Sequence, residues 1–81
     1  MKRIAVIGQS GEIPGDVRQM AEAVGAEIAK RKAVLLTGGG SGVMEAASKG
    51  AKEAGGLVIG ILAGDRTDVA NDYLDVPITT G

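Results

Sequence analysis

Apolar residues along this chain come in short unbroken runs that are separated by mixed segments. Unbroken runs rich in β-branched residues are typical of strands that are buried on both faces of a parallel sheet. Such runs predict strands at residues 4–7, 33–36 and 57–62. A fourth short strand is expected at 76–79, where Pro77 limits it to an edge of the sheet or to a strand's first residue.

The segment between the first two strands carries the spacing of an amphipathic helix. From residue 16 onward, apolar residues recur on one helical face, at Val17, Met20, Ala21, Val24 and Ile28. Asp16 is expected to cap this helix, with Gln19 three residues later as in a capping box. The basic cluster 30–32 closes it at the end where the helix dipole favours cations.

A second helix is predicted over residues 42–54 by an apolar stripe of Val43, Met44, Ala47 and Ala51. Ser41 is expected to act as its N-cap, because a serine hydroxyl can accept a hydrogen bond from the free amides of a first helical turn. Gly55 and Gly56 are expected to end the helix.

Strands that alternate with helices in this order imply right-handed crossovers and a parallel sheet. The expected fold class is α/β: a Rossmann-like three-layer fold reduced to a half, with a parallel sheet of about four strands in the order β-α-β-α-β-β. Residues 1–81 then form a single truncated Rossmann-like nucleotide-binding domain. Both helices fall on the same face of the sheet, so that only the segment 65–75 is left to cover the other face. Because soluble monomers rarely expose a large apolar surface, we expect either a homodimer or a missing C-terminal half.

Composition excludes several classes of function. The chain has no Cys and no His, which rules out disulfides, thiolate metal sites and imidazole chemistry. A net charge of −1 gives no reason to expect a nucleic-acid partner. The N-terminal apolar run is too short for a signal peptide or a membrane span, so we expect a cytoplasmic protein without membrane contact. Fourteen glycines stand against a single aromatic residue, which suggests tight strand-to-helix turns.

The strongest chemical signal is the glycine-rich stretch that follows the second strand. Glycines allow a sharp turn with positive φ, and their missing Cβ atoms let a ligand approach the main chain closely. The helix that follows offers unpaired amides at the positive end of its dipole, which suits a phosphate group. In a doubly wound sheet the end of the first strand faces the same crevice. The candidate ligand-binding residues are therefore Gly8, Ser10, Gly11, Thr37, Gly38, Gly39, Gly40, Ser41, Gly42, Val43 and Met44.

Other interpretations of these residues stay open. Glycines at such a turn can serve tight packing alone, and Met44 can belong to the core rather than to a ligand site. Better-known phosphate motifs do not fit, because Glu45 stands where a G-x-G-x-x-G fingerprint needs glycine and no Gly-Lys-Ser/Thr tripeptide occurs. Glu45 is expected to complement the helix dipole rather than to catalyse. No catalytic and no metal-binding residue is assigned.

The segment after the third strand is rich in acidic residues, namely Asp65, Asp68, Asp72 and Asp75. Their spacing matches no calcium loop, so a solvated acidic loop is favoured over a metal site. Asn71 and Tyr73 lie in the same segment and are expected to border the crevice beside the glycine-rich stretch.

Three stretches of the sequence carry a family resemblance: Lys2–Gly8, Leu35–Ala47 and Gly50–Leu62. Together they resemble the first half of the Lonely Guy superfamily, also known as the lysine decarboxylase-like proteins. Within that superfamily the chain is most similar to molybdenum cofactor carrier proteins and to bacterial relatives of the DNA-processing protein DprA. The likeness runs over nearly the whole chain, and Gly-Gly-Gly-Ser-Gly-Val-Met-Glu at residues 38–45 is fairly specific.

The resemblance implies a Rossmann-like fold, often dimeric, that binds the phosphate of a nucleotide or cofactor at the strand ends. Enzymes of the superfamily cleave the N-glycosidic bond of cytokinin nucleoside monophosphates. Their signature joins an early glycine-rich turn, matched by residues 38–44, to a later P-G-G-x-G-T-x-x-E segment that works with an Arg. The later segment is absent from residues 1–81.

The expected function is therefore binding of a phosphorylated small molecule, without complete catalytic machinery. The resemblance implies a nucleotide, an ADP-ribose-type ligand or a pterin-type ligand. Two alternatives remain. The chain can be a fragment of a nucleoside-monophosphate N-glycosidase that needs a second chain, or a structural half-fold with a vestigial site.

Overall fold

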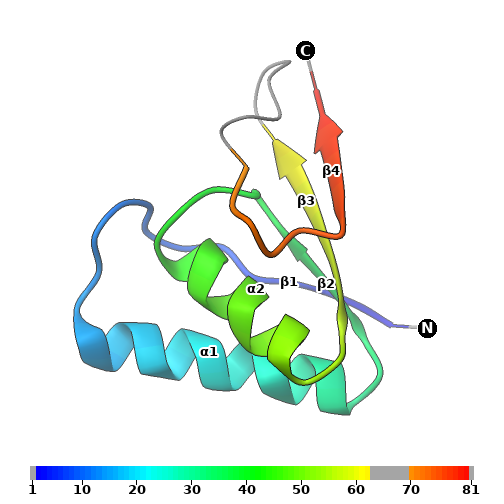
Figure 1. Cartoon of the computed structure of the whole chain (residues 1–81), viewed down its shortest axis with the longest axis horizontal. Coiled ribbons are helices and arrows are strands. Elements are labelled where there is room, and N and C mark those ends of the chain that lie inside the picture. The colour runs from blue at the N-terminus through cyan, green and yellow to red at the C-terminus, as the bar shows by residue number, and fades with distance from the viewer. Residues whose placement is uncertain (1, 63–69, 81) are drawn as a thin grey trace.

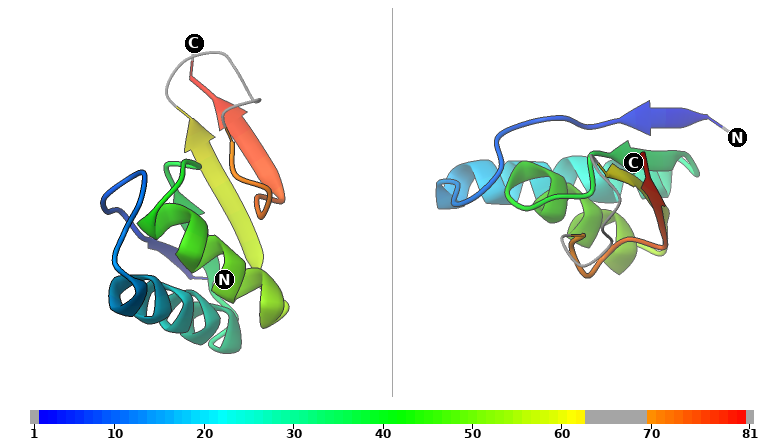
Figure 2. Two further views of the ribbon diagram at one scale, coloured as in Figure 1. Left: turned by 60° about the vertical axis from the view of Figure 1, so that its left-hand side comes forward. Right: turned by 90° about the horizontal axis from the view of Figure 1, so that it is seen from above.

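Four parallel strands and two helices make up the structure, a computed structural model that describes residues 2–62 and 70–80. The elements are β1 (Arg3–Ala5), α1 (Gly15–Lys30), β2 (Val34–Thr37), α2 (Val43–Glu53), β3 (Leu57–Leu62) and β4 (Val76–Thr79). The strands lie in the sheet in the order β1-β2-β3-β4, and every pair is parallel. Both helices lie on one side of the sheet (Figures 1 and 2). The predicted α/β class, the parallel sheet and the same-face placement of the helices are confirmed.

The first strand is shorter than the apolar run predicts. It covers Arg3–Ala5 instead of 4–7, and it lies at an edge of the sheet beside β2. The Val6 amide still donates to the Leu36 carbonyl oxygen at 2.9 Å, after which the chain leaves the ladder. Ile7 is 85% exposed. An unbroken apolar run indicates burial on both faces only inside a covered sheet, and this end of the edge strand is not covered by described residues.

The remaining strands fall close to their predicted positions. β2 begins and ends one residue later than expected and so includes Thr37, while β3 and β4 have the predicted bounds. β4 forms the other edge of the sheet, where Pro77 stands in register with Gly60. The edge position agrees with the expectation for Pro77, because proline has no amide proton to give to a further strand.

Helix α1 begins without the side-chain cap that the sequence predicts. It starts at Gly15, one residue before the expected capping position, and Pro14 precedes it. Asp16 therefore lies inside the first turn, where its carboxylate accepts a hydrogen bond from the Val17 amide at 3.0 Å. The predicted capping box is wrong, because Pro14 occupies the capping position and the helix begins two residues earlier than a cap at Asp16 would place it.

The buried face of α1 is narrower than the predicted stripe. Ala21 and Ile28 are buried, and so is Gly25, which the apolar pattern leaves out. The flank that carries Met20 and Val24 is exposed, and Met20 is 68% exposed. The spacing of the apolar residues therefore predicted the helix correctly but not which of its residues face the rest of the fold.

Helix α2 starts after Gly42 and has no side-chain cap from Ser41. The Ser41 hydroxyl instead accepts a hydrogen bond from the Gly11 amide at 2.9 Å. The predicted N-cap is wrong, because a contact with a distant loop takes the oxygen that would have capped the helix. Gly55, with φ of +82°, and Gly56, whose amide donates to the Ala51 carbonyl oxygen at 2.8 Å, end α2 as predicted.

The sheet has one covered face and one open face. Under the helices Leu35 and Val58 are completely buried. On the opposite face, large apolar side chains stay 41–46% exposed: Leu57, Ile61, Val76 and Ile78. The Cα atoms fill an envelope of 31 × 31 × 16 Å, thick enough for one sheet and one helix layer. The fold is thus the predicted half of a three-layer architecture.

Residues 70–75, the described part of the connection to β4, do not cover the open face. Leu74 packs against the core cluster that lies between the sheet and the helices. The expectation that segment 65–75 covers the second face is wrong for residues 70–75, while 65–69 lie outside the described residues. The physical reason is that a crossover of the same hand as the two helical ones returns to the same side of the sheet.

Candidate functional site

The glycine-rich turn (residues 37–42) lies where β2 ends and α2 begins, at the carboxyl ends of the parallel strands. The loop that follows β1 comes to the same place. The Gly11 amide donates to the Ser41 hydroxyl at 2.9 Å, and the Val43 amide donates to the Gln9 carbonyl oxygen at 2.9 Å. Ile13 anchors this loop by packing on Ala21 and Ala46. The structure therefore brings together the two loops that the sequence assigns to one crevice.

Two of the candidate glycines, Gly8 and Gly42, lie in close contact with other parts of the protein. A Cβ atom on Gly8 would lie 2.7 Å from the Val43 side chain. Gly42 has φ of +72°, and a Cβ there would collide with the Gln9 carbonyl oxygen and approach the Ser10 Cα to 2.9 Å. At these positions glycine allows the two loops to touch, which is the packing role that stayed open beside ligand binding.

Gly39 also serves the interior. It is buried with φ of +78°, and a Cβ would collide with the Leu62 side chain. Its amide donates to the Thr37 hydroxyl at 3.0 Å, and Thr37 is itself 5% exposed. The Thr37 hydroxyl therefore stabilises the turn from inside the fold.

Gly38 and Gly40 are more accessible. The atoms that a Cβ would meet belong to the flexible end of Met44, with the sulfur 2.8 Å from the Gly38 position and the methyl carbon 3.1 Å from the Gly40 position. Met44 is half-buried and lies along the turn. Gly11 has open space around it. Since a methionine side chain adapts its shape easily, these positions leave the main chain within reach of a ligand.

The start of α2 presents main-chain donors. Within the described residues, the amides of Gly40, Ser41, Met44 and Glu45 donate to no protein acceptor. Ser41 is exposed, and the amides lie at the positive end of the α2 dipole. Glu45 lies in the first turn, as the sequence predicts. Donors in this arrangement suit an anion such as a phosphate group.

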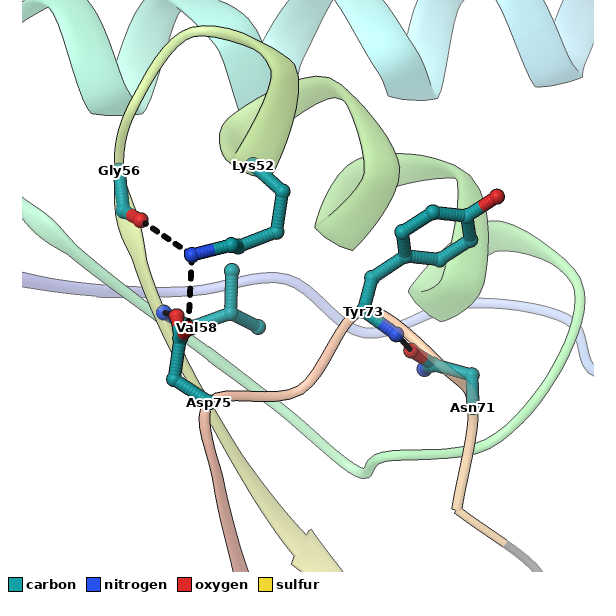
Figure 3. Close-up of polar contacts among 6 residues, drawn as sticks. All are labelled: Lys52, Gly56, Val58, Asn71, Tyr73 and Asp75. Carbon is teal, nitrogen blue, oxygen red and sulfur yellow. Dashed lines mark hydrogen bonds and ion pairs between the residues drawn. The ribbon is translucent and has the colours of Figure 1, made fainter.

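Asn71 reaches the turn from the segment before β4. Its side-chain amide donates to the carbonyl oxygens of Gly39 and Gly40, at 3.2 and 2.9 Å, and its main-chain amide donates to Gly39 at 2.9 Å. Its side-chain oxygen accepts from the Tyr73 amide at 3.0 Å (Figure 3). Asn71 thus borders the turn as expected, but the sequence did not predict that its side chain donates to two consecutive carbonyl groups. Nothing local in the sequence predicts a contact across 31 and 32 residues.

Asp75 is a structural residue rather than part of a solvated acidic loop. Its carboxylate accepts hydrogen bonds from the Val58 amide and from the Lys52 ammonium, each at 2.7 Å (Figure 3). Partial burial raises the pKa of Asp75, but the bonds from Lys52 and Val58 and the charge of Lys52 outweigh it and hold that pKa below 3.8. Asp72 is exposed, and Asp65 and Asp68 lie outside the described residues.

Other kinds of site find little support in the part of the chain that the structure describes. No three acidic residues gather there closely enough to hold a metal ion. No helix in the same part is long and apolar enough to cross a bilayer. A hollow of about 240 Å³ lies at the opposite end of the sheet from the turn, where Lys32 and Leu57 contribute to its lining.

Comparison with known proteins adds a family and close structural neighbours. The model of the SLOG cluster4 family matches residues 1–81. A protein of Archaeoglobus fulgidus is 45% identical over 80 residues, which are 99% of this chain and 52% of that protein. The molybdenum cofactor binding protein from the phototrophic bacterium Rippkaea orientalis superposes with a TM-score of 0.94 at 43% identity, over 99% of this chain and 50% of that one. Two structures of the molybdenum cofactor carrier protein from Chlamydomonas reinhardtii each give a TM-score of 0.85 at 41% identity, over 99% of this chain and 49% or 50% of that one.

The resemblance to molybdenum cofactor carrier proteins that the sequence suggested is thereby confirmed, and so is the Rossmann-like fold. The chain spans about half the length of the relatives that it matches.

Proposed function

Because the chain belongs to the SLOG cluster4 family, we propose that it binds the phosphate group of a small-molecule cofactor or nucleotide at the glycine-rich turn and the first turn of α2. The observation that carries this proposal is the set of amides at Gly40, Ser41, Met44 and Glu45, which donate to no described protein group at the positive end of a helix. The position agrees with the rule that open α/β sheets bind ligands beyond the carboxyl ends of their strands.

A pterin-type phosphate is the first ligand class that we propose. Its support is that structural neighbours above 40% identity are a molybdenum cofactor binding protein and a molybdenum cofactor carrier protein. A nucleotide or an ADP-ribose-type ligand would place the same phosphate chemistry at the same amides. The three classes share the anion and differ in the ring, so ligand comparison separates them.

The proposal is one of binding and not of catalysis. The glycosidase signature of the superfamily needs a later glycine-rich segment with a carboxylate, which residues 1–81 do not contain. The alternative is an enzyme fragment whose missing groups come from another chain. Incubating the protein with AMP tests it, because release of free adenine would support the fragment and contradict a binding module. We expect no release.

Calorimetric titration with inorganic phosphate, AMP, ADP-ribose and a phosphorylated pterin tests the binding proposal. We expect the phosphorylated ligands to bind and Gly40→Val to weaken them by about tenfold, since a branched side chain at the turn obstructs the amides. Gly40 is the informative position, because a Cβ there meets only the end of Met44, whereas one on Gly39 would collide with Leu62 and disturb the fold. Gly15→Val, at an open position of α1, is the matched control. Equal phosphate affinity in Gly40→Val and the wild type would move the site elsewhere.

We also infer that the open sheet face is an interface. Four large apolar side chains remain 41–46% exposed on it, and soluble monomers seldom leave such a surface bare. A second copy of the chain, or a segment such as the relatives carry beyond the matched half, would bury it. Helices packed on this face would complete the three-layer architecture, whereas a second copy docked through the same face would place sheet against sheet.

A further inference from the structure

We propose that Asn71 is a positioning residue of the phosphate site: it holds two consecutive carbonyl groups of the turn on one side, so that the amides of Gly40 and Ser41 face the ligand on the other. This inference rests on the proposed function and assigns a role within the same site.

The contacts of Asn71 leave little freedom to the turn. Its side chain donates both protons, to the Gly39 and Gly40 carbonyl oxygens at 3.2 and 2.9 Å, and its main-chain amide adds a third bond to Gly39 at 2.9 Å. Gly39 and Gly40 otherwise form a flexible stretch of main chain, because glycine has the widest conformational range of any residue. Three hydrogen bonds from one residue therefore select one conformation from many.

The consequence for the amides follows from peptide geometry. A trans peptide is planar, so the carbonyl of one residue and the amide of the next point in opposite directions, and none of the described peptides is cis. With the Gly39 and Gly40 carbonyls directed at Asn71, the amides of Gly40 and Ser41 both point away from it. Successive amides on one side of a turn form a concave donor site for anions.

The orientation of the Asn71 side chain is itself fixed. Its oxygen accepts from the Tyr73 amide at 3.0 Å, so exchanging oxygen and nitrogen would set two carbonyls against an oxygen and an amide against a nitrogen. Leu74, which packs on the core, holds this segment against the sheet. Asparagine is thus suited to the position because it combines two donors with one acceptor.

Two substitutions test the role. Asn71→Asp keeps the size and the acceptor for Tyr73 but removes both donors, and Asn71→Ala removes the side chain without adding charge. We expect each substitution to weaken the binding of inorganic phosphate by about tenfold, which is the equivalent of one lost hydrogen bond to a charged acceptor. Asp72→Asn, at the exposed neighbouring position, is the control and should bind like the wild type. If Asn71→Ala does not fold, Asn71→Ser replaces it with the same expected direction.

The readout is the amide NMR spectrum of the labelled protein during titration with inorganic phosphate. In the wild type the Gly40 and Ser41 amides should shift on binding, and in the Asn71 variants these two shifts should shrink while the dispersion of the spectrum reports an intact fold. Wild-type affinity in Asn71→Ala, with Gly40 and Ser41 shifting as before, would overturn the role of Asn71 and leave the phosphate site standing. A wild-type spectrum in which no amide of residues 38–45 responds would overturn both proposals.

Discussion

Asp75 joins the segment before β4 to both β3 and α2 through one carboxylate. It accepts from the Val58 amide and the Lys52 ammonium, and Lys52 also reaches the Gly56 carbonyl oxygen at 3.4 Å. Replacing Asp75 by Asn removes the negative charge and leaves one acceptor oxygen instead of two, so that one of the two bonds is lost. We expect the free energy of unfolding at neutral pH to fall by about 1–2 kcal/mol. Urea unfolding followed by circular dichroism measures the change.

The pH dependence of this difference has a definite sign. The folded-state pKa of Asp75 lies below the ordinary 3.8, so the stabilisation is complete above that value and is lost as the pH falls through the lower folded value. The gap between the wild type and Asp75→Asn should therefore be constant down to about pH 4 and close below it. The control Asp72→Asn should show the same loss of stability at low pH as the wild type. A stability difference between the wild type and Asp75→Asn that grows on acidification would contradict the role of the Asp75 carboxylate.

Sequence reasoning did not predict the hydrogen-bond partners of the polar side chains at the turn, namely those of Ser41, Thr37 and Asn71. The stretch of glycines before a helix was enough to locate the turn, because few other functions require so many glycines in one place. The partners of the polar side chains could not be predicted, since the Ser41 hydroxyl accepts from the Gly11 amide across 30 residues instead of capping its own helix. Local rules rank the contacts that a side chain can make nearby, and a tertiary partner displaces them without leaving a local signal.

Helices α1 and α2 touch through their main chains. A Cβ atom on Gly25 would collide with the Ala47 carbonyl oxygen, and one on Gly50 would collide with the Glu22 carbonyl oxygen. Gly25→Ala is therefore expected to destabilise the fold by about 1–3 kcal/mol through overpacking, although alanine is the better helix former in isolation. Thermal or urea unfolding tests this, with Gly15→Ala at an open position of α1 as the control. A stabilised Gly25→Ala variant would show that the helices can separate freely.

The same pair of glycines explains why the predicted face of α1 was too wide. Hydrophobic spacing counts Val24 and Met20 as core, whereas close helix packing selects the smallest residues, Gly25 and Ala21. Element types and the bounds of β3 and β4 followed from the sequence because apolar runs and helical periods are long enough to be distinct, whereas β1 is shorter than predicted and β2 is shifted by one residue. The face that a helix buries depends on the helix packed against it. The glycine inside α1, Gly25, is the sequence signal for that close contact.

The architecture of the whole chain was predictable because topology restricts it strongly. Alternating strands and helices with crossovers of one hand allow few arrangements, and the observed order β1-β2-β3-β4 with both helices on one face is the simplest of them. The same rule, applied to the connection from β3 to β4, would have placed residues 70–75 with the helices. The exposure of Ile7 was missed since an apolar run carries no information about how far the sheet extends.

The open face of the sheet makes self-association the expected behaviour of this chain. Ile61 and Ile78 stand in register on neighbouring strands and are 46% and 44% exposed. Analytical ultracentrifugation should reveal concentration-dependent association, and a separate titration should reveal binding of an apolar dye. The double variant Ile61→Thr and Ile78→Thr should reduce both association and dye binding while keeping β-branched side chains in the strands. Met20→Gln removes an apolar group from the α1 flank that is even more exposed, at 68%, and should leave association intact. The comparison of these variants therefore identifies the surface. A monomer at high micromolar concentration without dye binding would show that the open face is stable in water, and the case for an interface there would fail.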